Sequence, residues 1–76
     1  MVWVAKCDNS IHGGDCKAAC GYAQVYLKRK GLATRTRIAK ASGHDSASIV
    51  IYSDYGSDII SMLLRNYLSP WRWSVE

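Results

Sequence analysis

The sequence predicts an α+β fold in which two helices cover one face of an antiparallel sheet. Two segments carry apolar residues at helical spacing, and several short segments are rich in β-branched and aromatic residues. Their order is β-α-β-β-α with a further strand expected at the end, which matches a ferredoxin-like split βαβ arrangement. With 76 residues, we expect a single domain spanning 1–76.

The first strand and the first helix are expected within residues 2–30. Residues 2–7 (VWVAKC) are rich in strand formers, and after the loop DNSIHGG, Asp15 can cap a helix that runs to about Lys30. The basic end KRKG suits a helix C-terminus, because cations meet the negative end of the dipole and Gly31 can turn left-handed. The predicted apolar stripe consists of Cys16, Ala19, Cys20, Ala23, Tyr26 and Leu27.

Residues 33–41 and 46–53 predict a hairpin closed by the turn SGHD. A four-residue loop places Ala41 opposite Ser46. The register then puts isoleucines on the buried face, and two arginines with a tyrosine on the outward face. The expected pairs are Ile38–Ile49 and Thr36–Ile51 on the buried face, and Arg37–Val50 and Arg35–Tyr52 on the outward face.

A second helix is predicted in SDIISMLLRNYL, residues 57–68. It begins at Ser57 or Asp58 and ends before Pro70, because the residue preceding a proline avoids the helical conformation. Its expected stripe consists of Ile60, Leu63, Leu64 and Tyr67, widened by Ile59 and Met62. The tail WRWSVE alternates apolar and polar residues, which predicts a short last strand.

Positive charge is concentrated in one part of the chain. The net charge is +4, and residues 16–44 contain no Asp or Glu. The seven cations of this stretch are Lys17, Lys28, Arg29, Lys30, Arg35, Arg37 and Lys40. A polarised molecule with a basic face favours an anionic partner.

The sequence offers no sign of a membrane span or of export. No apolar run approaches the ~18 residues that cross a bilayer, and the start MVWVAKCDN lacks the basic and apolar regions of a signal peptide. Three cysteines are an odd number, so a closed disulfide scaffold would leave one unpaired. We expect a cytoplasmic protein with reduced thiols, no membrane contact and no cofactor.

The stretch CDNSIHGGDCKAAC, residues 7–20, contains all three cysteines. Cys7, His12, Cys16 and Cys20 have the donor types of a zinc site, although the spacing is not a C-x2-C knuckle. Alternatively, Cys16 at a helix start could be a nucleophile beside His12 and a Gly-Gly pair. We favour buried thiols behind a capped helix, because Cys16 and Cys20 belong to the apolar stripe and Asp15 would occupy the free amides.

The basic residues are the main candidates for binding. Arg35, Arg37 and Tyr52 on an open sheet face would resemble the aromatic and basic platforms that bind single-stranded nucleic acid, although SASIVIYS lacks the motif of an RNA-recognition strand. The set Lys28, Arg29 and Lys30 is expected at the adjoining helix end. A solvated basic face is the plainer interpretation of such a run.

Trp71, Arg72 and Trp73 form a further candidate surface, because Trp and Arg are enriched at interface hot spots. The alternative is that both indole rings cover a small core that lacks Phe. We favour the core interpretation, which predicts that substituting them unfolds the protein.

His44 lies in the segment SGHDSASIVIY. Residues 43–52 look like a segment of HicA-type toxins, small double-stranded-RNA-binding folds in which a catalytic histidine precedes a strand in a Gly-Ser-His segment. Here the order is Ser42-Gly43-His44, and the order of strands and helices also differs. The resemblance implies a ribonuclease centred on His44. We favour an exposed turn histidine, because a lone histidine supports no mechanism without a positioned partner.

No catalytic constellation emerges, so we expect a non-enzymatic binding protein. Small size, basic charge and an α+β pattern without enzyme motifs make the chain similar in character to phage-encoded inhibitors of bacterial defence, especially anti-CRISPR proteins. That resemblance has no motif and transfers no residue. It implies a steric inhibitor, in the host bacterial cytoplasm, of a protein or ribonucleoprotein effector complex. Direct nucleic-acid contact is the second hypothesis, and we expect a monomer or weak homodimer.

Overall fold

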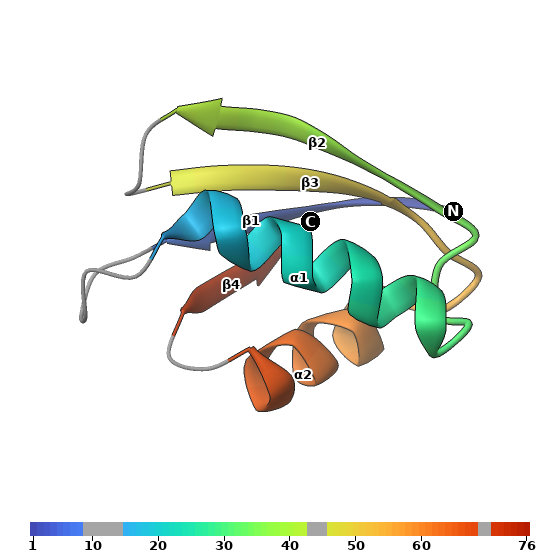
Figure 1. Cartoon of the computed structure of the whole chain (residues 1–76). Coiled ribbons are helices and arrows are strands. Elements are labelled where there is room, and N and C mark those ends of the chain that lie inside the picture. The colour runs from blue at the N-terminus through green and yellow to red at the C-terminus, as the bar shows by residue number, and fades with distance from the viewer. Residues whose placement is uncertain (9–14, 43–45, 69–70) are drawn as a thin grey trace.

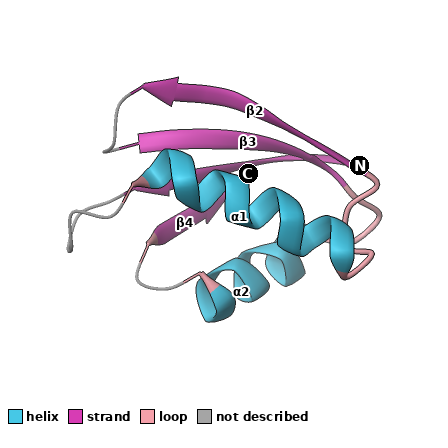
Figure 2. Cartoon of the chain, in the orientation of Figure 1, coloured by secondary structure: helices cyan, strands magenta, loops and turns pink. Residues whose placement is uncertain are grey.

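Four antiparallel strands form one sheet, and both helices lie on the same face of it (Figures 1 and 2). The computed structural model describes residues 1–8, 15–42, 46–68 and 71–76. Its elements are β1 (Val2–Asp8), α1 (Cys16–Arg29), β2 (Arg35–Ser42), β3 (Ser46–Tyr52), α2 (Ser57–Tyr67) and β4 (Arg72–Val75). The predicted fold class and element order, including the last strand, are therefore confirmed.

The strand order across the sheet is β2-β3-β1-β4. Helix α1 connects β1 to β2, yet β3 lies between these two strands, which is the split βαβ arrangement expected from the element order. The edges of the sheet are formed by β2 and by the four-residue strand β4. One face of the sheet is covered by the helices (Figure 1). The strand register places the outward side chains of all four strands on the opposite face.

Helix α1 begins and ends as its sequence predicts. The Asp15 carboxylate accepts a hydrogen bond from the Lys17 amide at 3.0 Å, so Asp15 is the N-cap. Gly31 follows the helix with φ +69°, the left-handed conformation that glycine adopts without a steric cost. Five of the six residues of the predicted stripe are buried, and the sixth, Tyr26, is half-buried.

The hairpin between β2 and β3 has the predicted register over its first half. The four expected pairs are all present: Arg35–Tyr52, Thr36–Ile51, Arg37–Val50 and Ile38–Ile49. The expectation that Ala41 lies opposite Ser46 is wrong, because Ala41 pairs with Ala47. An irregularity between Ile38 and Lys40 adds one residue to β2, and this bulge shifts every later pair by one position.

The core lies between the helices and the inner face of the sheet. Its members are Ala5, Cys7, Cys16, Ala19, Cys20, Ala23, Leu27, Ala33, Ala47, Ile49, Ile51, Ile60, Leu64 and Trp73. Helix α2 contributes less than its sequence suggests: Ile60 and Leu64 are buried and Leu63 is half-buried, whereas Ile59, Met62 and Tyr67 are exposed. The expectation of a wide buried face was therefore wrong. Helix α2 packs on the short edge strand β4, which offers too little surface to cover more than a narrow stripe.

Polar contacts of Ser53 close the end of the sheet beyond β3. The Ser53 hydroxyl donates to the Leu32 carbonyl oxygen and accepts from the Tyr55 amide at 3.0 Å. The Ser53 amide donates to the Met1 carbonyl oxygen at 2.9 Å. This one buried serine thus joins the α1–β2 connection, the β3–α2 connection and the N-terminus.

Neither α1 nor α2 has the length and apolar content that crossing a bilayer would require, as far as the structure describes the chain.

Candidate nucleic-acid interface

The outward face of the sheet brings the predicted arginines and tyrosine together. Because side chains alternate along a strand, residues that are paired across strands point to the same side. Val2 of β1 pairs with Tyr52, and Tyr52 pairs with Arg35, so the three form one row across the sheet. The next row is Val4, Val50 and Arg37. We call Arg35, Arg37 and Tyr52 the Arg-Tyr face.

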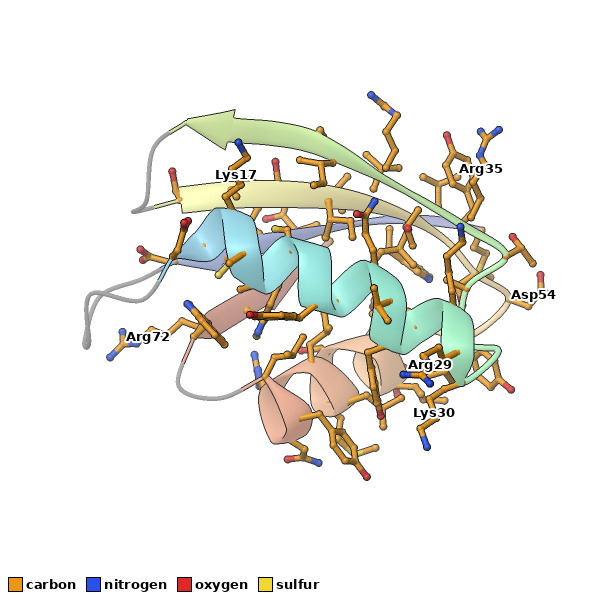
Figure 3. All side chains as sticks on the ribbon, in the orientation of Figure 1. Lys17, Arg29, Lys30, Arg35, Asp54 and Arg72 are labelled. Carbon is orange, nitrogen blue, oxygen red and sulfur yellow. The ribbon has the colours of Figure 1, made fainter. Side chains whose placement is uncertain are left out.

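Arg35 and Tyr52 form a stacked pair within this face. The Arg35 guanidinium carbon lies 4.4 Å from the centre of the Tyr52 ring, within the range of a cation–π interaction. Thr34 fixes the backbone beside the pair, since its amide and its hydroxyl both donate to the Tyr52 carbonyl oxygen, at 2.9 and 3.2 Å. Arg35 lies at the start of β2, at the end of the molecule that also carries Asp54 (Figure 3).

Charge is distributed unevenly across the same face. On the β4 side, Lys6 forms an ion pair with Glu76 at 3.8 Å between its Nζ and a carboxylate oxygen. Asp8 is paired in register with Arg72, so this side of the face carries both signs of charge in adjacent positions. On the β2 side, Arg35 and Arg37 are both exposed. The excess positive charge of the outer sheet face is therefore at the β2 edge.

The basic residues at the end of α1 lie on a different layer from the Arg-Tyr face. Lys28 and Arg29 form the last turn of α1, and Lys30 is its C-cap. All three are exposed, and Figure 3 shows Arg29 and Lys30 on the helical side of the molecule. The set adjoins Arg35 along the chain, but it does not extend the outward face of the sheet.

The C-terminal tryptophans pack in or against the core. Trp73 is only 3% exposed, and its indole Nε1 donates to the Leu68 carbonyl oxygen at 3.2 Å. Trp71 is half-buried against the same cluster, and its buried Nε1 has no hydrogen-bond partner among the described residues. Arg72 between them is exposed. This packing agrees with the interpretation that the indole rings cover the core.

All three cysteines are buried in the core between the sheet, which contributes Cys7, and helix α1, which contributes Cys16 and Cys20. The Cys7 thiol donates to Cys16 Sγ at 2.9 Å, and Cys20 lies one turn further along α1. Burial raises the pKa of Cys7, and burial together with the nearby Cys16 raises the pKa of Cys20 to about 11. Thiols that stay protonated and inaccessible are poor nucleophiles, which agrees with a packing role.

The two histidines that the zinc, nucleophile and ribonuclease hypotheses require lie outside the described residues. His12, Gly13 and Gly14 belong to residues 9–14, and His44 belongs to residues 43–45. Within the described residues, no group of three or more His, Cys, Asp or Glu side chains is placed to hold a metal ion.

A groove between α1 and α2 was not identified from the sequence. Its walls are formed by Tyr22, Val25, Tyr26, Arg29 and Lys30 on one side and by Tyr67 and Leu68 on the other, and we call it the helix groove. The signal was present, because Tyr22, Val25, Tyr26 and Arg29 follow a second i, i+3, i+4, i+7 series beside the buried stripe. Of these four residues of α1, only Tyr26 belongs to the predicted apolar stripe.

No protein-family model, no curated protein and no solved structure matches this chain.

Proposed function

We propose that this protein is a non-enzymatic binding protein whose Arg-Tyr face binds single-stranded nucleic acid. The observation that supports the proposal is the stacked pair of Arg35 and Tyr52, with Arg37 one row further along the same strand. Single strands are bound by cations that track the phosphates and by flat side chains on which bases stack. The Arg-Tyr face combines both kinds of group.

The contact between Arg35 and Tyr52 determines where a nucleic-acid base could stack. Arg35 already covers one side of the Tyr52 ring, so a base stacks either on the outer plane of the guanidinium or on the ring after Arg35 moves to a phosphate. Val2 extends the row at the opposite edge of Tyr52 and is 54% exposed. An exposed apolar side chain beside an aromatic ring offers further contact to a sugar or base.

A simpler role for the arginines is to protect an edge strand. Strand β2 is an edge of the sheet, and charged side chains on edges discourage pairing with other chains. That role requires charge alone and is indifferent to the identity of the cation. The stacked geometry adds a planar surface, which edge protection does not require, and this difference can be measured.

The wider role that we propose is steric inhibition of a nucleic-acid-processing complex of the CRISPR–Cas kind. The size, the basic charge and the absence of enzyme motifs in the sequence support it. An Arg-Tyr face on the nucleic acid of such a complex would obstruct loading without any chemistry. The HicA-like alternative is tested separately: His44→Ala removes ribonuclease activity if that hypothesis is right and changes nothing if the protein only binds.

The test is fluorescence anisotropy of labelled single-stranded and double-stranded DNA and RNA with the pure protein. We expect binding to single strands that the double variant Arg35→Ala, Arg37→Ala loses. The matched control is Lys17→Ala, Arg65→Ala, which removes the same charge from exposed positions on the two helices. Equal weakening of binding by both double variants would show that only the net charge of the protein matters. An absence of binding to any nucleic acid would refute the proposal.

A further inference from the structure

The helix groove lies on the side of the molecule opposite the Arg-Tyr face. Its volume is about 600 Å³, within the size range of ligand pockets in proteins. Three of its apolar or aromatic side chains are largely exposed: Tyr22 at 59%, Val25 at 55% and Tyr67 at 63%. Large apolar side chains that gather in one concave place indicate an interaction surface.

An aromatic pair connects the two walls of the helix groove. The rings of Tyr26 in α1 and Tyr67 in α2 lie 5.0 Å apart between centroids, with 31° between their planes. Such tilted ring contacts stabilise a pair beyond the area that they bury. Burial, followed by the neighbouring Tyr67, raises the pKa of Tyr26 above the ordinary value of a phenol, which further favours the neutral form. The Tyr26 side of the groove therefore presents an uncharged aromatic surface.

The charged residues of the groove are all cationic. Arg29 and Lys30 contribute the positive charge, and no Asp or Glu is among the described residues that line the groove. Helix α1 contains no acidic residue at all. Figure 3 shows Arg29 and Lys30 at the C-terminal end of α1, on the side of the helix that faces α2. A ligand that fits must combine apolar groups with negative charge near one end.

We propose that the helix groove binds a short acidic amphipathic segment of a partner protein. A helix or extended peptide places apolar anchors between α1 and α2, and its carboxylates meet Arg29 and Lys30. This surface is independent of the Arg-Tyr face, so one can exist without the other. A protein that held both would connect a polypeptide partner to nucleic acid.

Charge distinguishes this occupant from two others. In a symmetric contact between two copies, each groove would bring its own Arg29 and Lys30 against another uncharged, tyrosine-lined surface, which leaves the cations without partners. A nucleic acid would meet two cations, Arg29 and Lys30, among the described residues of largely apolar walls, and two charges neutralise few phosphates. An acidic amphipathic segment satisfies both the cations and the apolar walls.

The test uses ¹⁵N-labelled protein and a panel of short synthetic helical peptides. Each acidic peptide carries Leu or Trp at i, i+3, i+4 and i+7 with Glu elsewhere, and its matched peptide has Lys in place of every Glu. We expect acidic peptides to shift the amide signals of Tyr22, Val25 and Tyr67 and to bind about tenfold or more tightly than their Lys counterparts. Equal binding of both sets, or no binding by any acidic peptide, overturns the proposal.

Variants assign the binding to the groove. Val25→Glu and Arg29→Glu should each weaken peptide binding by about tenfold or more, and both positions are exposed, so the fold should persist. Lys17→Glu is the control, because it makes the same charge change as Arg29→Glu on an exposed position at the other end of α1 (Figure 3). Equal weakening by Lys17→Glu would overturn the proposal.

Two other results would also overturn it. If Val25→Glu abolishes self-association in sedimentation and peptides do not compete, the groove is an interface between copies of this chain. If Val25→Glu weakens nucleic-acid binding as much as Arg35→Ala does, the groove belongs to a nucleic-acid surface. Nucleic-acid binding that fails while acidic peptides bind leaves the groove proposal standing and refutes only the proposed function.

Discussion

The guanidinium carbon of Arg35 lies 4.4 Å from the centre of the Tyr52 ring, and the strand register places both residues on the outward face of the sheet. Their backbones are paired directly across β2 and β3, so the stack follows from the strand register and does not depend on a loop. A planar cation held on an aromatic ring by regular structure is a preformed surface for a second flat group.

Replacing Arg35 with Lys should separate geometry from charge. The lysine keeps the positive charge and loses the planar guanidinium, which is worth about 0.5–1 kcal/mol in exposed cation–π pairs. We therefore expect Arg35→Lys to weaken single-strand binding by about two- to fivefold in anisotropy titrations. Tyr52→Phe, which keeps the ring, should bind like the unsubstituted protein. Undiminished binding by Arg35→Lys would show that the stack has no part in recognition.

Replacing Ser53 with Ala should destabilise the protein out of proportion to the size of the change. The lost hydroxyl leaves the Leu32 carbonyl and the Tyr55 amide without this partner beside a buried position, at a cost of about 1–3 kcal/mol. Urea unfolding followed by circular dichroism measures it. Thr34→Val is the control, since the Thr34 amide still donates to the Tyr52 carbonyl oxygen after the hydroxyl is removed. Equal costs for the two variants would contradict the role given to Ser53.

Replacing Trp73 with Ala should unfold most of the protein. Removing a buried indole costs about 3–5 kcal/mol, comparable with the whole stability of many small domains. The neighbouring exposed residue gives the control, so Arg72→Ala should melt at nearly the same temperature as the unsubstituted protein. A Trp73→Ala variant with unchanged thermal unfolding would contradict the packing described and support an interface role for the tail.

The buried thiol of Cys20 should make stability fall at alkaline pH. Its pKa rises from 9.0 to about 11 on folding, so the unfolded chain loses this proton at lower pH than the folded chain. The stabilisation is complete below pH 9 and is lost as pH rises toward 11, since one pKa unit corresponds to about 1.4 kcal/mol. Urea unfolding at a series of pH values should show a steeper decline for the unsubstituted protein than for Cys20→Ala. Parallel declines would contradict the assignment to Cys20.

The sequence predicted those elements whose determinants are local. Asp15 and Gly31 bound α1 because a carboxylate can cap the first turn and a glycine can take a positive φ, and both preferences act within a few residues. The outward arginines followed from alternation along β2. The pairing of Ala41 did not, because a bulge between Ile38 and Lys40 is not encoded by alternation.

The positions of the Arg-Tyr face and the helix groove depend on tertiary packing, which the periodicity of apolar residues in the sequence does not determine. The apolar pattern of α2 places Tyr67 in the stripe, but its ring contacts Tyr26 of α1 at the helix groove and it stays 63% exposed. The separation of Lys28 and Lys30 from Arg35 likewise required the three-dimensional layers. Although they are close in the chain, Lys28 and Lys30 lie on the helical side and Arg35 lies on the outer sheet face.

The salt dependence of single-strand binding tests the central claim most directly. Each phosphate contact on a single strand contributes a slope of about −0.7 to log K against log salt concentration. We therefore expect the slope to become shallower by about 1.4 in Arg35→Ala, Arg37→Ala, and to stay unchanged in Lys17→Ala, Arg65→Ala. The same slope in all three proteins would contradict the account, because the Arg-Tyr face would then make no contact with phosphate.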